Sequence, residues 1–133
     1  MKNNIEKAQK DNQIFEKELS QTIIKCAFEV YNKLGYGFLE KVYENSLMVE
    51  LAQNNIKAVQ QVPIEVYYKN KVVGEYKVDI LVENKIILEL KAEKFLNKEH
   101  AAQILNYLKA SKIKIGYLIN FGVKGVEFKR FIF

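Results

Sequence analysis

The stretch that decides the fold reads Tyr76-Lys77-Val78-Asp79-Ile80-Leu81-Val82, then Glu83-Asn84-Lys85, then Ile86-Ile87-Leu88-Glu89-Leu90-Lys91. Its two outer segments are rich in apolar and β-branched residues, which is typical of strands. The polar tripeptide between them has the length of a common hairpin loop. The stretch therefore predicts two antiparallel strands joined by a tight turn.

The hydrophobic pattern also predicts how the two strands pair. Side chains alternate between the faces of a strand, so the apolar residues at positions 78, 80 and 82 are expected on one face. That face matches the apolar face of the next strand only when Ile80 lies opposite Leu88. In this register Asp79 lies directly opposite Glu89, whereas a two-residue turn would spoil both faces.

Two carboxylates that face each other across a hairpin need compensation. Directly opposite Cβ atoms in an antiparallel pair lie about 4.5–5.5 Å apart, so the charges of Asp79 and Glu89 repel each other. A divalent cation would relieve this repulsion, and oxygen-only ligands favour Mg²⁺ or Mn²⁺ over zinc. Lys91 lies on the same face as Glu89 and offers a second compensation. The alternative is an ordinary solvated strand face, on which Lys91 bridges the two acids.

The composition is that of a single globular domain. The chain has 133 residues, 49% of them hydrophobic, and a net charge of +5 that suits a polyanionic partner. One cysteine, Cys26, and one histidine, His100, exclude an intramolecular disulfide and a metal cluster built on several cysteines or histidines. The absence of a long apolar run and of a signal-peptide pattern predicts a cytoplasmic protein. We expect residues 1–15 to form a polar N-terminal extension and residues 16–133 to form the domain.

Hydrophobic periodicity predicts three helices and five strands along the chain. Gly35 is expected to end the first helix and Asn97 to cap the third. Pro63 predicts an edge strand or a bulge. In chain order, the expected elements are helices at 14–34 and 39–53, strands at 56–68, 72–82 and 86–92, a helix at 98–110, and strands at 113–121 and 126–133.

A second motif carries a resemblance to a known family. The segment Gly37-Phe38-Leu39-Glu40-Lys41-Val42-Tyr43 matches a Gly-x-x-Glu-x-x-Tyr signature. It resembles the GxxExxY family, which is assigned to the superfamily of PD-(D/E)XK nucleases. The wider resemblance runs from about Thr22 to Phe121 and includes Gln61-Val62-Pro63, Gly74-Glu75-Tyr76, Asp79, Glu89-Leu90-Lys91, Gln103 and Leu118-Ile119-Asn120-Phe121-Gly122.

The resemblance implies an α/β (α+β) fold with a restriction-endonuclease-like core. Its centre would be a mixed sheet of about five strands flanked by helices, in the order ααβββαββ, with the site on the second and third strands. Asp79 and Glu89 would then be metal ligands, with Glu40 as an additional acidic ligand. Lys91 would orient the attacking water. Gln103 would lie beside the site, on the helix after the third strand.

The activity implied by the resemblance is hydrolysis of phosphodiester bonds by a nuclease that depends on Mg²⁺ or Mn²⁺. Nucleic acid would be the partner, with DNA favoured over RNA, and no membrane is implicated. Two of the site residues also have simpler explanations. Glu40 would stabilise the helix dipole as an acid in a first turn, and Gln103 would be an ordinary exposed residue of its helix.

The alternative is a non-catalytic module that binds nucleic acid or oligomerises on the same fold. The final segment, residues 126–133, alternates apolar and charged side chains and would form an edge strand able to pair across a homodimer. A module that has lost catalysis is expected to lack one of the charged site residues. Asp79, Glu89 and Lys91 are all present, so the sequence favours an enzyme.

Overall fold

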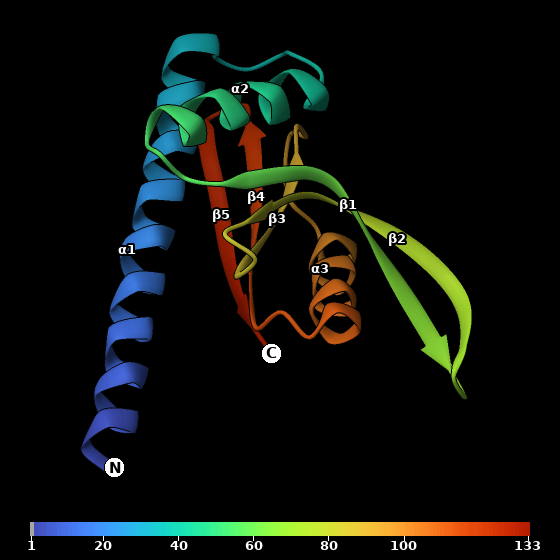
Figure 1. Cartoon of the computed structure of the whole chain (residues 1–133). Helices are drawn as coiled ribbons and strands as arrows, with labels where there is room; N and C mark the ends of the chain where they lie inside the picture. The colour runs from blue at the N-terminus through green and yellow to red at the C-terminus, as the bar shows by residue number, and fades with distance from the viewer. Residues whose placement is uncertain (1) are drawn as a thin grey trace.

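The computed structural model describes the backbone of residues 2–133 and their side chains, except the side chains of residues 2, 3, 8, 11, 12 and 15. The elements are α1 (Lys2–Leu34), α2 (Glu40–Gln53), β1 (Ala58–Tyr68), β2 (Lys71–Val82), β3 (Ile86–Lys91), α3 (Lys98–Ser111), β4 (Ile115–Gly122) and β5 (Gly125–Ile132). The strands form one five-stranded sheet in the spatial order β1-β2-β3-β4-β5 (Figure 1). The β3–β4 pair is parallel and the other neighbours are antiparallel. The predicted class, the mixed sheet and the element order are confirmed.

Helices cover both faces of the sheet and divide the core into two clusters (Figure 1). On one face α1 and α2 pack through residues such as Ile23 and Leu47, which share a cluster with Leu88. On the other face α3 packs through Leu108, which shares the second cluster with Ile87. The two central strands β3 and β4 are buried from both sides, which explains their nearly continuous apolar sequence.

Local sequence signals set the helix ends. Gly35 has φ +70°, and its N–H donates to the carbonyl of Tyr31 at 2.7 Å, which ends α1 as predicted. Asn97 caps α3, because its side-chain oxygen accepts from the N–H groups of Glu99 and His100. The His100 ring accepts from the Asn97 N–H at 3.3 Å in return, which completes a capping box.

The first helix is longer than its predicted span. α1 begins at Lys2, so the expected boundary between residues 1–15 and 16–133 falls inside one continuous helix. The polar N-terminal residues include many lysines, glutamates and glutamines, which have high helix propensity. The N-terminal half of α1 extends beyond the sheet (Figure 1). Within residues 2–133, no helix combines the length and the apolar character needed to cross a membrane.

The β2–β3 hairpin has the predicted register. Ile80 pairs with Leu88 and Val82 pairs with Ile86, and the three residues 83–85 form the turn. The regular pairing between the two strands ends at Ile80 and Leu88. The hydrophobic pattern therefore predicts the register correctly, because any other alignment would expose one of the two apolar faces.

One predicted apolar face is interrupted at Asp79. The sequence predicts that Val78, Ile80 and Val82 share a face. In the structure Ile80 and Val82 join the core under α1 and α2, whereas Val78 joins the core under α3. Across from Asp79 on β1, Gln61 has φ +54°, a left-handed conformation that breaks the alternation of a strand. Beyond this point the β1–β2 ribbon bends away from the sheet and projects past α3 (Figure 1).

The buried acid Glu44 of α2 anchors this bend, and the sequence analysis does not single it out. Glu44 is 3% exposed. One of its carboxylate oxygens accepts from the side-chain amide of Gln61 at 3.0 Å, and the other accepts from Gln60 at 2.6 Å and from the Lys41 ammonium at 2.8 Å. These donors compensate the burial of a charge. Pro63 follows on β1, which is an edge strand as predicted.

Candidate active site

Asp79, which lies within β2, contacts the backbone near the C-terminal end of β3. Where the regular pairing of the two strands ends, Asp79 Oδ2 accepts a hydrogen bond from the Leu90 N–H at 2.7 Å. The carboxylate serves as the acceptor at this position because β2 has bent away from β3. Glu89 and Lys91 flank Leu90 and share one face of β3. The predicted site residues Asp79, Glu89 and Lys91 therefore lie near one another in the structure.

Glu89 is a buried acid with an unused oxygen. It is 3% exposed, and its Oε1 has no hydrogen-bond partner among the described residues. Burial raises the pKa of Glu89 to about 9, reinforced by the negative charge of Asp79 and a side-chain hydrogen bond to it, while Lys91 opposes the shift. In the metal-free protein at neutral pH, Glu89 therefore carries a proton.

Glu40 and Lys91 lie within electrostatic reach of this pair. Burial, and then the negative charge of Asp79, raise the pKa of Glu40, whereas the Lys91 ammonium lowers it. Glu40 is the first residue of α2, so it also lies at the positive end of the helix dipole. Three acids and one lysine from α2, β2 and β3 thus influence one another at one end of these strands.

The carboxylates at the site are of the kind that bind a hard divalent cation, although they do not form a complete coordination site. Within the part of the chain that the structure describes, no group of three histidine, cysteine, aspartate or glutamate side chains is close enough to hold a metal ion. Asp79 and Glu89 nevertheless offer adjacent carboxylates, and Glu89 Oε1 is a buried acceptor without a donor. A cation bound there would satisfy that oxygen and replace the proton on Glu89. The role of Glu40 as a third ligand stays a prediction.

The helix α3 brings Tyr107 next to the acidic pair, with Gln103 behind it. Gln103 Nε2 donates to Tyr107 Oη at 2.7 Å. Burial raises the pKa of the Tyr107 hydroxyl, and the negative charges of Glu89 and Asp79 raise it further. The two α3 residues are one helical turn apart and lie on the same side of the helix. In this structure Gln103 contacts the site through Tyr107.

Comparison with known proteins assigns the fold to a family. A model of the PD-(D/E)XK nuclease superfamily matches residues 17–131. The chain belongs to this superfamily. The crystal structure of SSO0001 is similar in fold alone, with a TM-score of 0.55 and 21% sequence identity. The similarity covers 70% of this chain and 50% of the SSO0001 chain, so the chain spans half the length of that protein. No protein with a curated description matches the sequence.

Asn120 holds a segment next to the candidate site of this PD-(D/E)XK superfamily chain. No role for Asn120 was predicted from the sequence. Asn120 lies opposite Lys91 in the β3–β4 ladder and is fully buried. Its Oδ1 accepts from the Glu93 N–H at 2.9 Å, and its Nδ2 donates to the Glu93 carbonyl at 2.9 Å. Both bonds hold the segment that leaves β3 directly after Lys91. A lone amide in the apolar β4 sequence was the signal that could have identified it.

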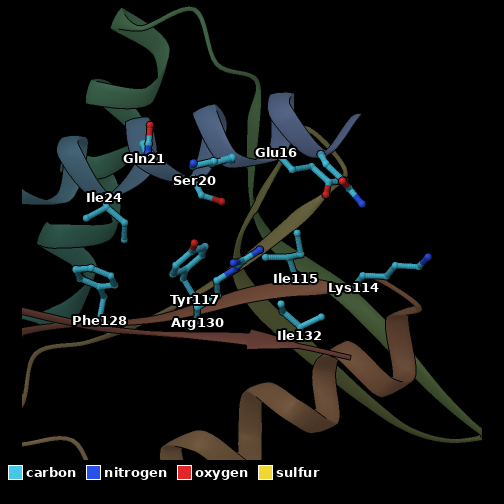
Figure 2. A pocket seen from close by; sticks show the side chains of 12 residues that line it. Glu16, Ser20, Gln21, Ile24, Lys114, Ile115, Tyr117, Phe128, Arg130 and Ile132 are labelled. Atoms are coloured by element: carbon cyan, nitrogen blue, oxygen red, sulfur yellow. The ribbon is translucent and has the colours of Figure 1, made fainter. Parts of the chain in front are cut away.

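A cavity of about 700 Å³ lies elsewhere, between α1 and the strands β4 and β5 (Figure 2). Its lining includes Ser20, Tyr117, Phe128 and Arg130. None of the predicted site residues of this superfamily chain lines that cavity. The acidic pair therefore belongs to a different part of the molecule, near the C-terminal end of β3 and within β2.

Proposed function

We propose that this protein is a Mg²⁺- or Mn²⁺-dependent nuclease of the GxxExxY branch of the superfamily, and that it hydrolyses phosphodiester bonds in nucleic acid. One observation carries the proposal. Glu89 is buried beside Asp79, and its Oε1 has no hydrogen-bond partner among the described residues, so a bound cation would satisfy this oxygen. The net charge of +5 supports a polyanionic substrate. We propose DNA rather than RNA as the preferred substrate.

Each site residue has a role that its position supports. Asp79 and Glu89 hold the ion, which supplies an activated water and stabilises negative charge on the phosphate when bound. Lys91 shares the face of Glu89, and its ammonium orients the attacking water and stabilises charge on the phosphoryl oxygens. Glu40 completes the acidic set from α2. Gln103 holds the Tyr107 hydroxyl in place beside the acids.

The experiment is a cleavage assay with a panel of single- and double-stranded DNA and RNA, in Mg²⁺ or Mn²⁺. Lys91→Ala and Glu89→Gln are compared with the wild type, and Lys129→Ala is the matched control because it removes an exposed strand lysine from β5. We expect cleavage by the wild type and the control only, with losses of about 100-fold or more for the site variants. Cleavage that survives Lys91→Ala would contradict the mechanism. A wild type that cleaves none of the substrates with either ion would contradict the nuclease.

A further inference from the structure

A groove separates the projecting part of the β1–β2 ribbon from α3. Its volume is about 650 Å³, and its lining includes Tyr67 and Tyr76 from the ribbon and Asn106, Lys109 and Lys112 from α3 and its C-cap. We call this the hairpin groove. Asp79 and Glu89 do not line it.

Two tyrosines in contact with each other connect the hairpin groove to the acidic site. The ring of Tyr76 contacts the ring of Tyr107, with centroids 5.5 Å apart and an interplanar angle of 51°. Tyr107 is the α3 residue that lies beside Glu89 and Asp79. Tyr76 of the groove therefore contacts the α3 residue that lies within electrostatic reach of the two carboxylates.

The groove presents aromatic surface that is partly open to solvent. Tyr67 is 61% exposed and Tyr76 is 48% exposed. Both side chains line the groove. Tyr68, the next residue of β1, does not line it, and the Lys69 ammonium lies 5.6 Å from the Tyr68 ring centroid.

The charges along the groove suit a polyanion. Lys109 and Lys112 are exposed on the α3 side. The acid on the ribbon side is Glu65, and its carboxylate accepts a hydrogen bond from the Tyr67 hydroxyl. Ring faces on one wall and cations on the other are the combination that binds single-stranded nucleic acid, because unpaired bases stack on aromatic rings while phosphates contact lysines.

We infer that the hairpin groove binds a single strand of nucleic acid, with bases stacked on Tyr67 and Tyr76, and leads its backbone to Asp79 and Glu89. The inference rests on the proposed nuclease function and deepens it by naming the form of the substrate. A duplex keeps its bases paired and stacked, so it would leave the ring faces without partners. A single strand can stack its bases on the tyrosines of the ribbon and place its phosphates beside the lysines of α3.

The test is the binding of a short fluorescein-labelled oligothymidylate, followed by fluorescence anisotropy in EDTA so that no cleavage occurs. We expect Tyr67→Leu and Tyr76→Leu each to weaken binding by roughly tenfold, which is typical of the loss of one stacked base. Tyr76→Phe keeps a ring and should bind like the wild type. Tyr68→Leu is the matched control, since it removes an exposed tyrosine of the same ribbon that does not line the groove.

Several results would overturn the inference. One is unchanged oligothymidylate binding in Tyr67→Leu and Tyr76→Leu, and another is an equal loss in Tyr68→Leu. A third is tighter binding of a duplex of the same length that depends on the same two tyrosines. A fourth is dissociation of a homodimer by the groove variants with no change in oligothymidylate binding, which would assign the groove to a second copy of the chain.

The binding assay separates this inference from the nuclease proposal. If the wild type cleaves nucleic acid but its binding of oligothymidylate does not depend on Tyr67 and Tyr76, the groove inference is overturned and the nuclease proposal stands. Binding that depends on both tyrosines, in a protein that cleaves no substrate, would overturn the nuclease and support the groove as a binding site for single strands.

Discussion

The carboxylate of Asp79 accepts a hydrogen bond from the N–H of Leu90 at 2.7 Å, just beyond the last regular pair of the β2–β3 hairpin. The bond bridges two strands that have begun to separate, because the β1–β2 ribbon changes face at Asp79 and Gln61. The same separation leaves Glu89 Oε1 buried without a donor. The unsatisfied oxygen of the candidate site thus lies where the two strands separate.

Replacement of Asp79 by asparagine should abolish metal binding while the fold survives. An asparagine has nearly the same shape, and its side-chain oxygen can still accept from the Leu90 N–H, but it lacks the negative charge that holds a divalent cation. We expect calorimetry with Mn²⁺ to show no binding by Asp79→Asn, and circular dichroism to match the wild type. Metal affinity equal to that of the wild type would remove Asp79 from the ligand set.

The stability of the metal-free protein should fall as the pH rises. The folded-state pKa of Glu89 is about 9, above its ordinary value of 4.5, so the folded protein holds this proton more tightly than the unfolded chain does. The stabilisation that this proton gives the folded protein is complete below pH 4.5 and is lost as the pH rises toward 9. Thermal denaturation in EDTA across this window should show a falling Tm, with a smaller decline for Glu89→Gln. Parallel declines in both proteins would rule out this carboxyl as the source.

The left-handed backbone at Gln61 predicts an unusual order of substitutions. Gln61→Val should destabilise the fold, because a β-branched residue at φ +54° costs about 1–2 kcal/mol and the bond to Glu44 is also lost. Gln61→Gly loses the same bond but adopts the conformation freely. Urea denaturation should therefore rank the glycine variant above the valine variant. The reverse order would contradict a left-handed residue at this position.

Removal of the Asn120 amide should reduce stability and impair the proposed activity together. Asn120→Ala removes both hydrogen bonds to the N–H and carbonyl of Glu93, each worth about 0.5–1.5 kcal/mol. It should also loosen the segment that follows Lys91, because both bonds to Glu93 are lost. Asn32→Ala, on the exposed side of α1, is the control and should behave like the wild type in urea denaturation and in cleavage. Full activity of Asn120→Ala would show that this clamp has no effect on the site.

Much of the fold could be predicted from the sequence because neighbouring residues encode it. The alternation from Tyr76 to Lys91 predicts the hairpin and its register, Gly35 ends α1, and Asn97 begins α3. Each of these features depends on the backbone and side chains within a few positions of itself. The same local pattern predicts that Asp79 and Glu89 are neighbours.

The sequence by itself determined the strands, the register of the β2–β3 hairpin, the end of α1, the start of α3, and the proximity of Asp79, within β2, to Glu89 and Lys91 near the end of β3. Only the tertiary structure decided that the β1–β2 ribbon bends at Gln61, that Glu89 is buried with one oxygen unsatisfied, and that Tyr107 and Asn120 support the site. Burial, pKa shifts and cross-strand clamps arise between residues far apart in the chain. No local periodicity encodes them, because they depend on how separate elements pack against one another.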